Sequence, residues 1–409
     1  MQVHILGLGS IGQLLAHNLR RVLPSTHDIT LIYKTQRRAK DFLLHGAVVN
    51  VEREGITSSS KGFRYGVYNS LVSLPTVAVE SKGGVSPAGD VRLPKDQIES
   101  LIVATKAQQV LPAIQTLLPH LSSDATIVLM QNGLGVYENL IHDVFRNVQR
   151  RPHFILASNT HGAYIKGEST TVHAGIGTLQ FGIVPDPLGR DFEAGFHDEN
   201  VSKLERRLRL TDIESPVDDP AGQRYRSLRT TVSALLRMEQ LNVSWKPISE
   251  VQSVMRQKLV VNAVINPLTA IMNCRNGDIF ASASTRRIMR WVCQEAAKVL
   301  AAQQLAETGS WLDDLSKQGV DTDTVDVGRM PLDLSAENLE DQVLQVAHDT
   351  KGNISSMLSD VRKGRFTEVH YITGYLLKLG KVYRVNMPCT AMLHELVKAR
   401  GHIPIDQML

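Results

Sequence analysis

The sequence predicts an N-terminal α/β domain with a doubly wound parallel sheet, followed by an all-α C-terminal domain. Two observations support this. Apolar runs typical of buried strands alternate with stretches of helical spacing, and the runs lie at residues 3–6, 28–34, 100–105 and 125–130. From about Ile248 onward, nearly every segment has helical periodicity. We therefore expect one domain over residues 1–247 and a second over residues 248–409.

A glycine-rich turn follows the first predicted strand. It reads GLGSIG, with Gly7, Gly9 and Gly12 in a GxGxxG pattern before a helical stretch. In such a turn the first glycine allows the tight bend, the second lets the backbone approach a pyrophosphate, and the third permits close helix–strand packing. The motif predicts a Rossmann-type dinucleotide site, with a plain structural turn as the alternative.

The residues that follow the other predicted strands suggest which dinucleotide is bound. The second strand ends in Tyr33-Lys34 and is followed by Arg37 and Arg38, with no acid to bind a ribose hydroxyl. Cations there suit a 2′-phosphate and favour NADP, although a solvated basic helix start would look the same. The stretches TKAQQ and MQNGLG follow two further strands, and they contribute Lys106 and Asn132.

Several stretches depart from the strand–helix alternation. Residues 154–181 alternate as β-strands do, and we expect antiparallel additions at a sheet edge, closed by a strand at 242–247. Residues 185–226 and 308–335 are polar, with little periodicity. We expect both to be surface insertions, the first with one helix near 201–210.

Composition excludes several classes of function. The 409 residues carry a net charge of only +4, and the basic residues are scattered, so no nucleic-acid partner is expected. No apolar run reaches membrane-spanning length, and Met1 leads straight into a strand without a targeting segment. We expect a cytoplasmic protein, with a mitochondrial location left open. No metal site is expected, because the cysteines and the histidines considered as ligands are scattered and lack metal-ligand spacing. These residues are Cys274, Cys293, Cys389, His161, His173 and His370.

A polar stripe marks one helix of the C-terminal domain. Lys258, Asn262 and Asn266 are spaced i, i+4, i+8 within an otherwise apolar stretch, so they share one helix face. Asparagine is a weak helix former, and short polar groups on an otherwise apolar helix favour a wet, partly buried pocket over a solvated surface. Pro267 is expected to bend this helix or to end its first segment.

Taken together, these motifs resemble the ketopantoate reductase (2-dehydropantoate 2-reductase) family. The resemblance rests on GLGSIG, TKAQQ, QNGLG, KLVVNAVINPLTAIMNCRNGD and NISSMLSDVRKGRFTEVHYITG, in that order. It lapses over the two expected insertions, and the long form looks more like the fungal members than the compact bacterial ones.

The resemblance implies a role for each matching residue. Lys258 matches the catalytic general acid, and Glu368 matches an acid linked to catalysis and to nicotinamide–ribose placement. The matching substrate-binding residues are Asn262, Asn266, Asn276 and Ser356. The matching cofactor-binding residues, besides Glu368, are Gly7, Leu8, Gly9, Ser10, Ile11, Gly12, Lys34, Lys106 and Asn132.

The expected reaction is the NADPH-dependent reduction of 2-dehydropantoate to (R)-pantoate, a step toward coenzyme A, in a cleft between the two domains. The chemistry of the polar stripe is consistent with this reaction. Hydride addition to a ketone leaves an alkoxide that needs a proton donor, and the Lys258 ammonium can supply the proton. Two alternatives stay open: a reductase for another 2-oxo acid, and a non-catalytic dinucleotide-binding regulatory or scaffold protein. A homodimer is left open as well.

Overall fold

The computed structural model describes residues 1–68, 98–167, 170–202, 204–214, 222–317 and 334–403. The chain forms two compact units, the first over residues 1–131 and 136–251 and the second over residues 132–135 and 252–409. The short stretch 132–135 therefore groups with the helical unit, although the chain on either side of it belongs to the first. The functional domain boundary at 247/248 stays a prediction.

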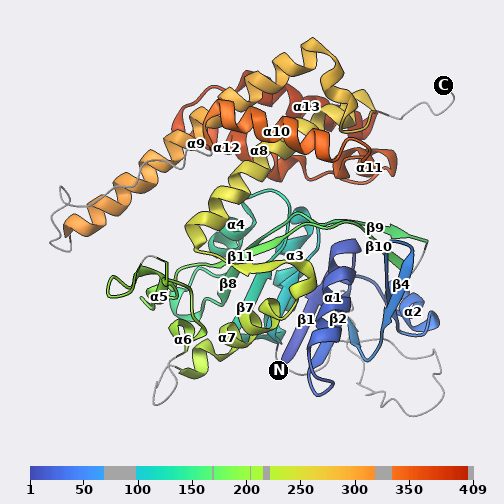
Figure 1. Ribbon diagram of the computed structural model, residues 1–409, viewed down its shortest axis with the longest axis vertical. Helices are drawn as coiled ribbons and strands as arrows, with labels where there is room; N and C mark the ends of the chain where they lie inside the picture. The colour runs from blue at the N-terminus through green and yellow to red at the C-terminus, as the bar shows by residue number, and fades with distance from the viewer. Residues whose placement is uncertain (69–97, 168–169, 203, 215–221, 318–333, 404–409) are drawn as a thin grey trace. The chain divides into compact units, whose positions relative to one another are not determined.

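The first unit is built on an eight-stranded sheet in the order β12-β11-β8-β7-β6-β1-β2-β5 (Figure 1). All neighbours run parallel except β8 and β11, so the predicted doubly wound parallel sheet is confirmed. The strands are β1 (Gln2–Leu6), β2 (Asp28–Tyr33), β5 (Arg64–Val67), β6 (Ile98–Val103), β7 (Leu121–Leu129), β8 (His153–Asn159), β11 (Leu179–Ile183) and β12 (Val243–Trp245).

The predicted antiparallel additions are only partly confirmed. β11 is antiparallel to β8, and β12 closes the edge as expected. However, β8 itself is a parallel member of the sheet, and β9 and β10 belong to a second sheet of order β4-β3-β10-β9. Period-2 alternation shows that a strand is half-buried but does not reveal which sheet it joins. The second sheet comprises β3 (Val49–Arg53), β4 (Ile56–Ser60), β9 (Gly162–Lys166) and β10 (Thr170–Gly175).

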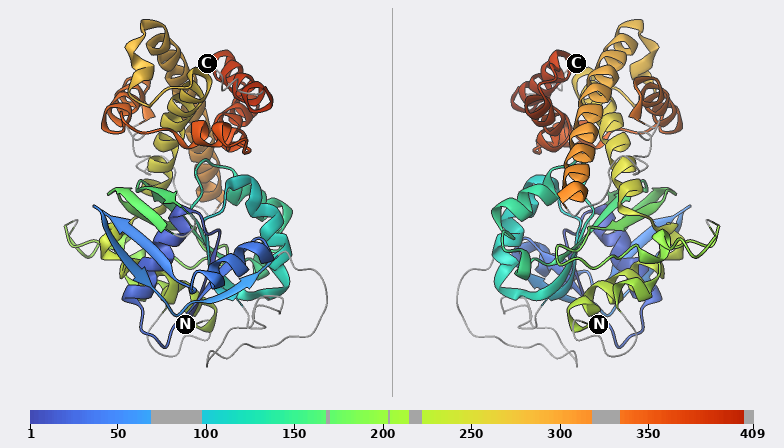
Figure 2. Two further views of the ribbon diagram at one scale, coloured as in Figure 1. Left: turned by 90° about the vertical axis from the view of Figure 1, so that its right-hand side faces the viewer. Right: turned by 90° about the vertical axis from the view of Figure 1, so that its left-hand side faces the viewer.

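Helices cover both faces of the main sheet. Because the chain passes from β1 to β2 in one direction and from β6 through β7 to β8 in the other, right-handed crossovers place their helices on opposite faces. Figure 2 shows α1 and α7 on one side and α3 and α4 on the other. These helices, together with α2, are α1 (Ser10–Val22), α2 (Gln36–Leu44), α3 (Ala107–Leu117), α4 (Val136–Asp143) and α7 (Gly222–Leu236).

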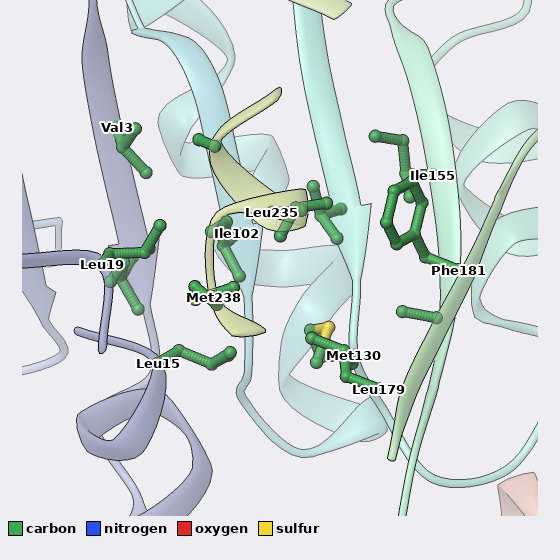
Figure 3. Close-up of a cluster of buried hydrophobic side chains, with 14 of the residues drawn as sticks. Val3, Leu15, Leu19, Ile102, Met130, Ile155, Leu179, Phe181, Leu235 and Met238 are labelled. Atoms are coloured by element: carbon green, nitrogen blue, oxygen red, sulfur yellow. The ribbon is translucent and has the colours of Figure 1, made fainter. Parts of the chain in front are cut away.

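The core of the first unit lies between the sheet and the α1–α7 layer. Figure 3 shows Leu15 and Leu19 of α1 and Leu235 of α7 facing Ile102 and Phe181 from the strands. Alternate residues of the buried strands point to this face, as strand geometry requires. The packing fixes the carboxyl ends of β1, β2 and β6 at one edge of the sheet.

The first expected insertion is not wholly peripheral. The helix predicted near 201–210 is wrong, because the described residues there form bends, a turn and irregular chain before α6 (Leu210–Ile213) begins. A separate turn of helix, α5, spans Ala194–His197. Phe192, Ile213 and Tyr225 are buried in the core of the unit. Single anchors of this kind carry no periodicity, so the sequence pattern did not reveal them.

The second unit is helical, as predicted, and has its own hydrophobic core (Figure 1). Its longer helices are α8 (Ile248–Met272), α9 (Ala283–Lys317), α10 (Ala336–Asp349), α11 (Ser356–Arg362), α12 (Thr373–Tyr383) and α13 (Pro388–His402). The 3₁₀ turns η4 (Asp278–Ala281) and η7 (Val369–Tyr371) connect them. The predicted insertion at 308–335 is wrong for its first part, because α9 continues to Lys317, while residues 318–333 lie outside the described residues.

Helix α8 passes Pro267 without ending. Proline removes one backbone hydrogen bond and normally kinks or breaks a helix, yet the helix runs on to Met272. The flanking Val264 and Leu268 are completely buried, so packing on both sides stabilises the proline turn. The helix ends at Met272, and the next residue, Asn273, has a left-handed φ of 53°, a conformation in which asparagine is common.

Candidate functional site

The glycine turn between β1 and α1 has the geometry that its sequence predicts. Gly7 has a φ of 95°, and a Cβ there would lie 2.5 Å from the backbone nitrogen of Thr105. A Cβ on Gly12 would collide with the carbonyl oxygen of Gly7. A Cβ on Gly9, in contrast, would meet nothing within 4 Å. Two glycines are thus required by packing, and the third leaves open space beside the backbone at the start of α1.

The other residues of this turn offer mainly backbone groups to a ligand. The Ser10 hydroxyl donates to the carbonyl oxygen of Ala163 on β9 at 2.9 Å. Leu8 and Ile11 pack partly against the hydrophobic core. The first N–H groups of a helix have no partners within it, and they favour a negative charge. The turn can therefore hold an anion through its backbone.

Lys34 lies one residue beyond β2, at the same edge of the sheet as the glycine turn. β1 and β2 pair in parallel up to Leu6 and Ile32, so their carboxyl ends are neighbours. Lys34 and Arg37 are exposed, and the Thr35 hydroxyl accepts a hydrogen bond from the Arg38 N–H at the start of α2. Lys106 follows β6 and stands immediately before α3. The structure thus brings Lys34, Lys106 and the glycine turn to one edge.

Asn132 is held by the helical unit. Gly133 has a φ of 83°, and a Cβ there would collide with Tyr371. The next residue, Leu134, donates its N–H to the carbonyl oxygen of Tyr371 at 3.0 Å. Tyr371 in turn donates its N–H to the carbonyl oxygen of Glu368 at 3.0 Å. Asn132 is therefore fixed to the segment that carries Glu368, which its position after β7 did not predict.

Lys258 and Glu368 form an electrostatic pair within the helical unit. Burial lowers the pKa of Lys258 from its ordinary value to about 8, and the negative charge of Glu368 opposes that shift by raising the pKa. Glu368 is itself buried and immediately precedes η7. An ammonium group with a pKa near 8 gives up its proton more readily than an ordinary lysine does.

The polar stripe of α8 is longer than the sequence suggested. Lys258, Asn262 and Asn266 lie on α8, and Asn266 is buried. Thr269, one turn further on, is also buried, and its hydroxyl lies 2.7 Å from that of Ser355. Sequence reasoning missed this contact, although Thr269 is three residues beyond Asn266 and continues the same helix face.

Ser356 is placed by its neighbour. Ser355 caps α11 by accepting the Leu358 N–H at 3.1 Å, and Ser356 is the exposed first residue of that helix. Asn276 supports the preceding segment: its N–H donates to the Asn353 carbonyl at 3.1 Å, and its Nδ2 donates to the Thr350 hydroxyl at 2.9 Å. Asn276 and Ser356 are thus linked through one stretch of chain.

Two of the noted histidines are paired, which their spacing did not predict. His161 Nδ1 lies 3.0 Å from His173 Nε2, and it also accepts the Gly177 N–H at 2.9 Å. His161 Nε2 contacts the carbonyl oxygen of Leu241 at 2.9 Å. Both ring nitrogens of His161 are thus occupied by the protein. In the part of the chain that the structure describes, no three His, Cys, Asp or Glu residues are grouped to hold a metal ion.

Comparison with known proteins decides the family. The model described as "Ketopantoate reductase PanE/ApbA" matches residues 3–186, and that for its C-terminal part matches residues 250–401. A 2-dehydropantoate 2-reductase of Salmonella typhimurium is 30% identical over 302 residues, which is 74% of each chain. The chain belongs to the ketopantoate reductase family. It is therefore an oxidoreductase.

Fungal members of the ketopantoate reductase family match more of the chain. A "Probable 2-dehydropantoate 2-reductase" of Schizosaccharomyces pombe is 26% identical over 93% of this chain and 90% of its own length. The 2-dehydropantoate 2-reductase of Saccharomyces cerevisiae is 25% identical over 95% of this chain and 90% of its own. The resemblance to the long, fungal-like form is confirmed.

Solved structures confirm the fold of this chain. A probable 2-dehydropantoate 2-reductase from Bacillus subtilis has a TM-score of 0.59 at 20% identity, covering 98% of this chain and 100% of that one. D-mandelate dehydrogenase with NADH and anilino(oxo)acetate has a TM-score of 0.65 at 17% identity, covering 98% of this chain and 99% of that one.

Among the described residues, no helix is both long and apolar enough to cross a membrane.

Proposed function

We propose that this enzyme reduces 2-dehydropantoate to (R)-pantoate with NADPH, a step toward coenzyme A, in the cytoplasm. The observation that carries the proposal is Lys258, which has a pKa of about 8 and lies under the influence of the buried Glu368. A scaffold protein has no use for a half-buried lysine whose pKa is lowered toward neutral pH. The curated names of the relatives supply the substrate of the proposal.

The residues at the sheet edge fit a dinucleotide. The open space beside Gly9 admits a pyrophosphate to the start of α1, where backbone N–H groups favour negative charge. Lys34 supports NADP over NAD, because the end of β2 offers an exposed cation and no acid. Lys106 and Asn132 are proposed to complete the site. When bound, the reduced nicotinamide supplies the hydride.

The chain supplies the proton and holds the substrate. As the ketone carbon is reduced, negative charge develops on its oxygen, and the Lys258 ammonium donates a proton to that oxygen. Glu368 favours the protonated lysine before the reaction, because an opposite charge raises the pKa of an ammonium group. We propose that Asn262, Asn266 and Asn276 bind the polar groups of the substrate and that Ser356 contacts its carboxylate. Amide groups offer donors and acceptors without adding charge.

One assay separates this proposal from the alternatives. The purified enzyme is mixed with NADPH and a panel of 2-oxo acids, and NADPH oxidation is followed by its absorbance. We expect the highest kcat/KM with 2-dehydropantoate. A higher value with another branched or bulky 2-oxo acid would support a different substrate on the same site. No turnover of any member by a protein that binds NADPH would support a regulatory or scaffold role.

A further inference from the structure

Gln131 is a buried glutamine whose side-chain nitrogen has a hydrogen-bond partner and whose side-chain oxygen has none among the described residues. It follows β7 and is 9% exposed. Its Nε2 donates to the carbonyl oxygen of Val103 at 2.6 Å. Its Oε1 is buried and has no hydrogen-bond partner among the residues that the structure describes. Because the Val103 carbonyl can only accept, the amide nitrogen must face it, so the amide oxygen points elsewhere.

The position of Gln131 shows what kind of ligand its oxygen would meet. Val103 ends β6, and the chain beyond it reaches Thr105, whose backbone touches the glycine turn at Gly7. The order of the sheet reverses between β1 and β6. Ligands of doubly wound sheets bind beyond the carboxyl ends of the strands at this reversal. Gln131 stands at that edge, two residues beyond the end of β7, the strand next to β6.

A buried oxygen without a partner does not mark a site by itself. Gln303 on α9 is 8% exposed, its Nε2 donates to Glu307, and its Oε1 is also unpartnered. The two residues differ in their location, because Gln303 lies on a helix of the second unit. Gln131 combines an unpartnered buried acceptor with the ligand edge of the sheet, and such an acceptor is unfavourable until a donor arrives.

We propose that Gln131 Oε1 accepts a hydrogen bond from the nicotinamide nucleoside half of the dinucleotide, an inference that rests on the proposed function. The adenosine half belongs on the β1–β2 side, where Lys34 is proposed to bind the 2′-phosphate. β7 lies on the other side of the point between β1 and β6 where the strand order reverses. That half carries two kinds of donor, the carboxamide N–H₂ and the ribose hydroxyls. Gln131 is thus assigned as a cofactor-binding residue one position before the predicted Asn132.

The test measures dissociation constants of the full-length Gln131→Leu protein by fluorescence titration. We expect its Kd for NADPH to rise about 5- to 50-fold, as the loss of one hydrogen bond in a buried site implies. Its Kd for adenosine 2′,5′-bisphosphate should stay within about twofold of the unmodified value. The matched control Gln303→Leu should change neither constant. Gln131→Met, which is closer in shape, replaces the leucine variant if that one does not fold.

A second cofactor identifies the donor. The reduced 3-acetylpyridine analogue of NADPH lacks the carboxamide N–H₂. If the carboxamide donates, the unmodified enzyme binds the analogue more weakly than NADPH, and the Gln131 variant no longer discriminates. If a ribose hydroxyl donates, both cofactors weaken equally in the variant. Unchanged NADPH binding by a folded Gln131 variant would overturn the inference alone, whereas an unmodified protein that binds no dinucleotide would overturn the proposed function with it.

Discussion

The hydroxyl of Thr269 on α8 lies 2.7 Å from the hydroxyl of Ser355, the residue that caps α11. Thr269 also donates to the Ile265 carbonyl at 2.8 Å, and Ser355 accepts the Leu358 N–H at 3.1 Å. The Ser355 proton is therefore directed to the Thr269 oxygen. This contact ties the helix that bears Lys258 to the helix that begins with Ser356.

Removing this tie should weaken substrate binding and stability together. Ser355→Ala loses the helix cap and the contact with Thr269, so the free energy of unfolding should fall by about 1–2 kcal/mol. Because Ser356 loses its fixed position, KM for the 2-oxo acid should rise severalfold. Chemical denaturation and steady-state kinetics measure the two effects. Ser335→Ala, which removes the cap of α10, is the control that should lower stability without changing KM. An unchanged KM in Ser355→Ala would contradict the positioning role.

The segment expected as the first insertion, residues 185–226, should contribute to the stability of the fold through the carboxylate of Glu193. Glu193 accepts the Ile248 N–H at 2.7 Å and so caps α8. Glu193→Ala should cost about 1 kcal/mol of stability, the usual value of a lost cap. Glu193→Gln keeps an acceptor for Ile248 and should lose much less. Equal losses in the two variants, measured by urea unfolding, would show that the charge rather than the hydrogen bond matters.

The pH dependence of Glu193 provides a separate check. Burial raises the pKa of Glu193 above its ordinary value. The ionised carboxylate is therefore less favourable in the folded chain, and its stability contribution declines as pH rises through the folded pKa. Glu193→Gln cannot ionise, so its stability relative to the unmodified enzyme should improve as the pH rises above about 4, where an ordinary glutamate ionises. If the stability difference between the two proteins does not change as the pH rises above about 4, the raised pKa of Glu193 would be contradicted.

Much of the fold was predictable because it repeats a period. The strands and the glycine turn each carry a local pattern that the structure confirms, and the polar stripe lies on one helix, α8, as its spacing predicts. The second sheet, the pairing of His161 with His173 and the Thr269–Ser355 contact join residues far apart in the sequence. No local pattern encodes such partners. The continuation of α9 past residue 308 was missed because its last turns are largely exposed, and exposed polar helices resemble loops in composition.

Cofactor preference should depend on Lys34. The unmodified enzyme should have a higher kcat/KM for NADPH than for NADH, because Lys34 can pair with the 2′-phosphate and no acid at the end of β2 binds a ribose hydroxyl. Lys34→Glu should erode or reverse this preference by repelling the phosphate. The ratio of the two kcat/KM values is the measurement. Equal values for both cofactors in the unmodified enzyme would refute this role of Lys34.

The rate should depend on pH through Lys258. A general acid acts only when protonated, so kcat should decline as the pH rises through about 8, the pKa of Lys258. Glu368 raises that pKa, so Glu368→Gln should move the decline to lower pH. The two residues should also couple, with the double variant losing less than the sum of the two single losses as free energies. If the losses in kcat are additive and the pH profile of Glu368→Gln is unchanged, Glu368 has no part in the proton transfer.

The most direct test of the whole account is the kcat of Lys258→Ala with 2-dehydropantoate and saturating NADPH. A positioned general acid contributes roughly 10²- to 10⁴-fold, so kcat should fall by that factor. The Kd for NADPH should change little, because the glycine turn and Lys34 belong to the other unit. A folded Lys258→Ala protein that retains near-normal kcat would contradict the account and would make Lys106 the next candidate for the proton donor.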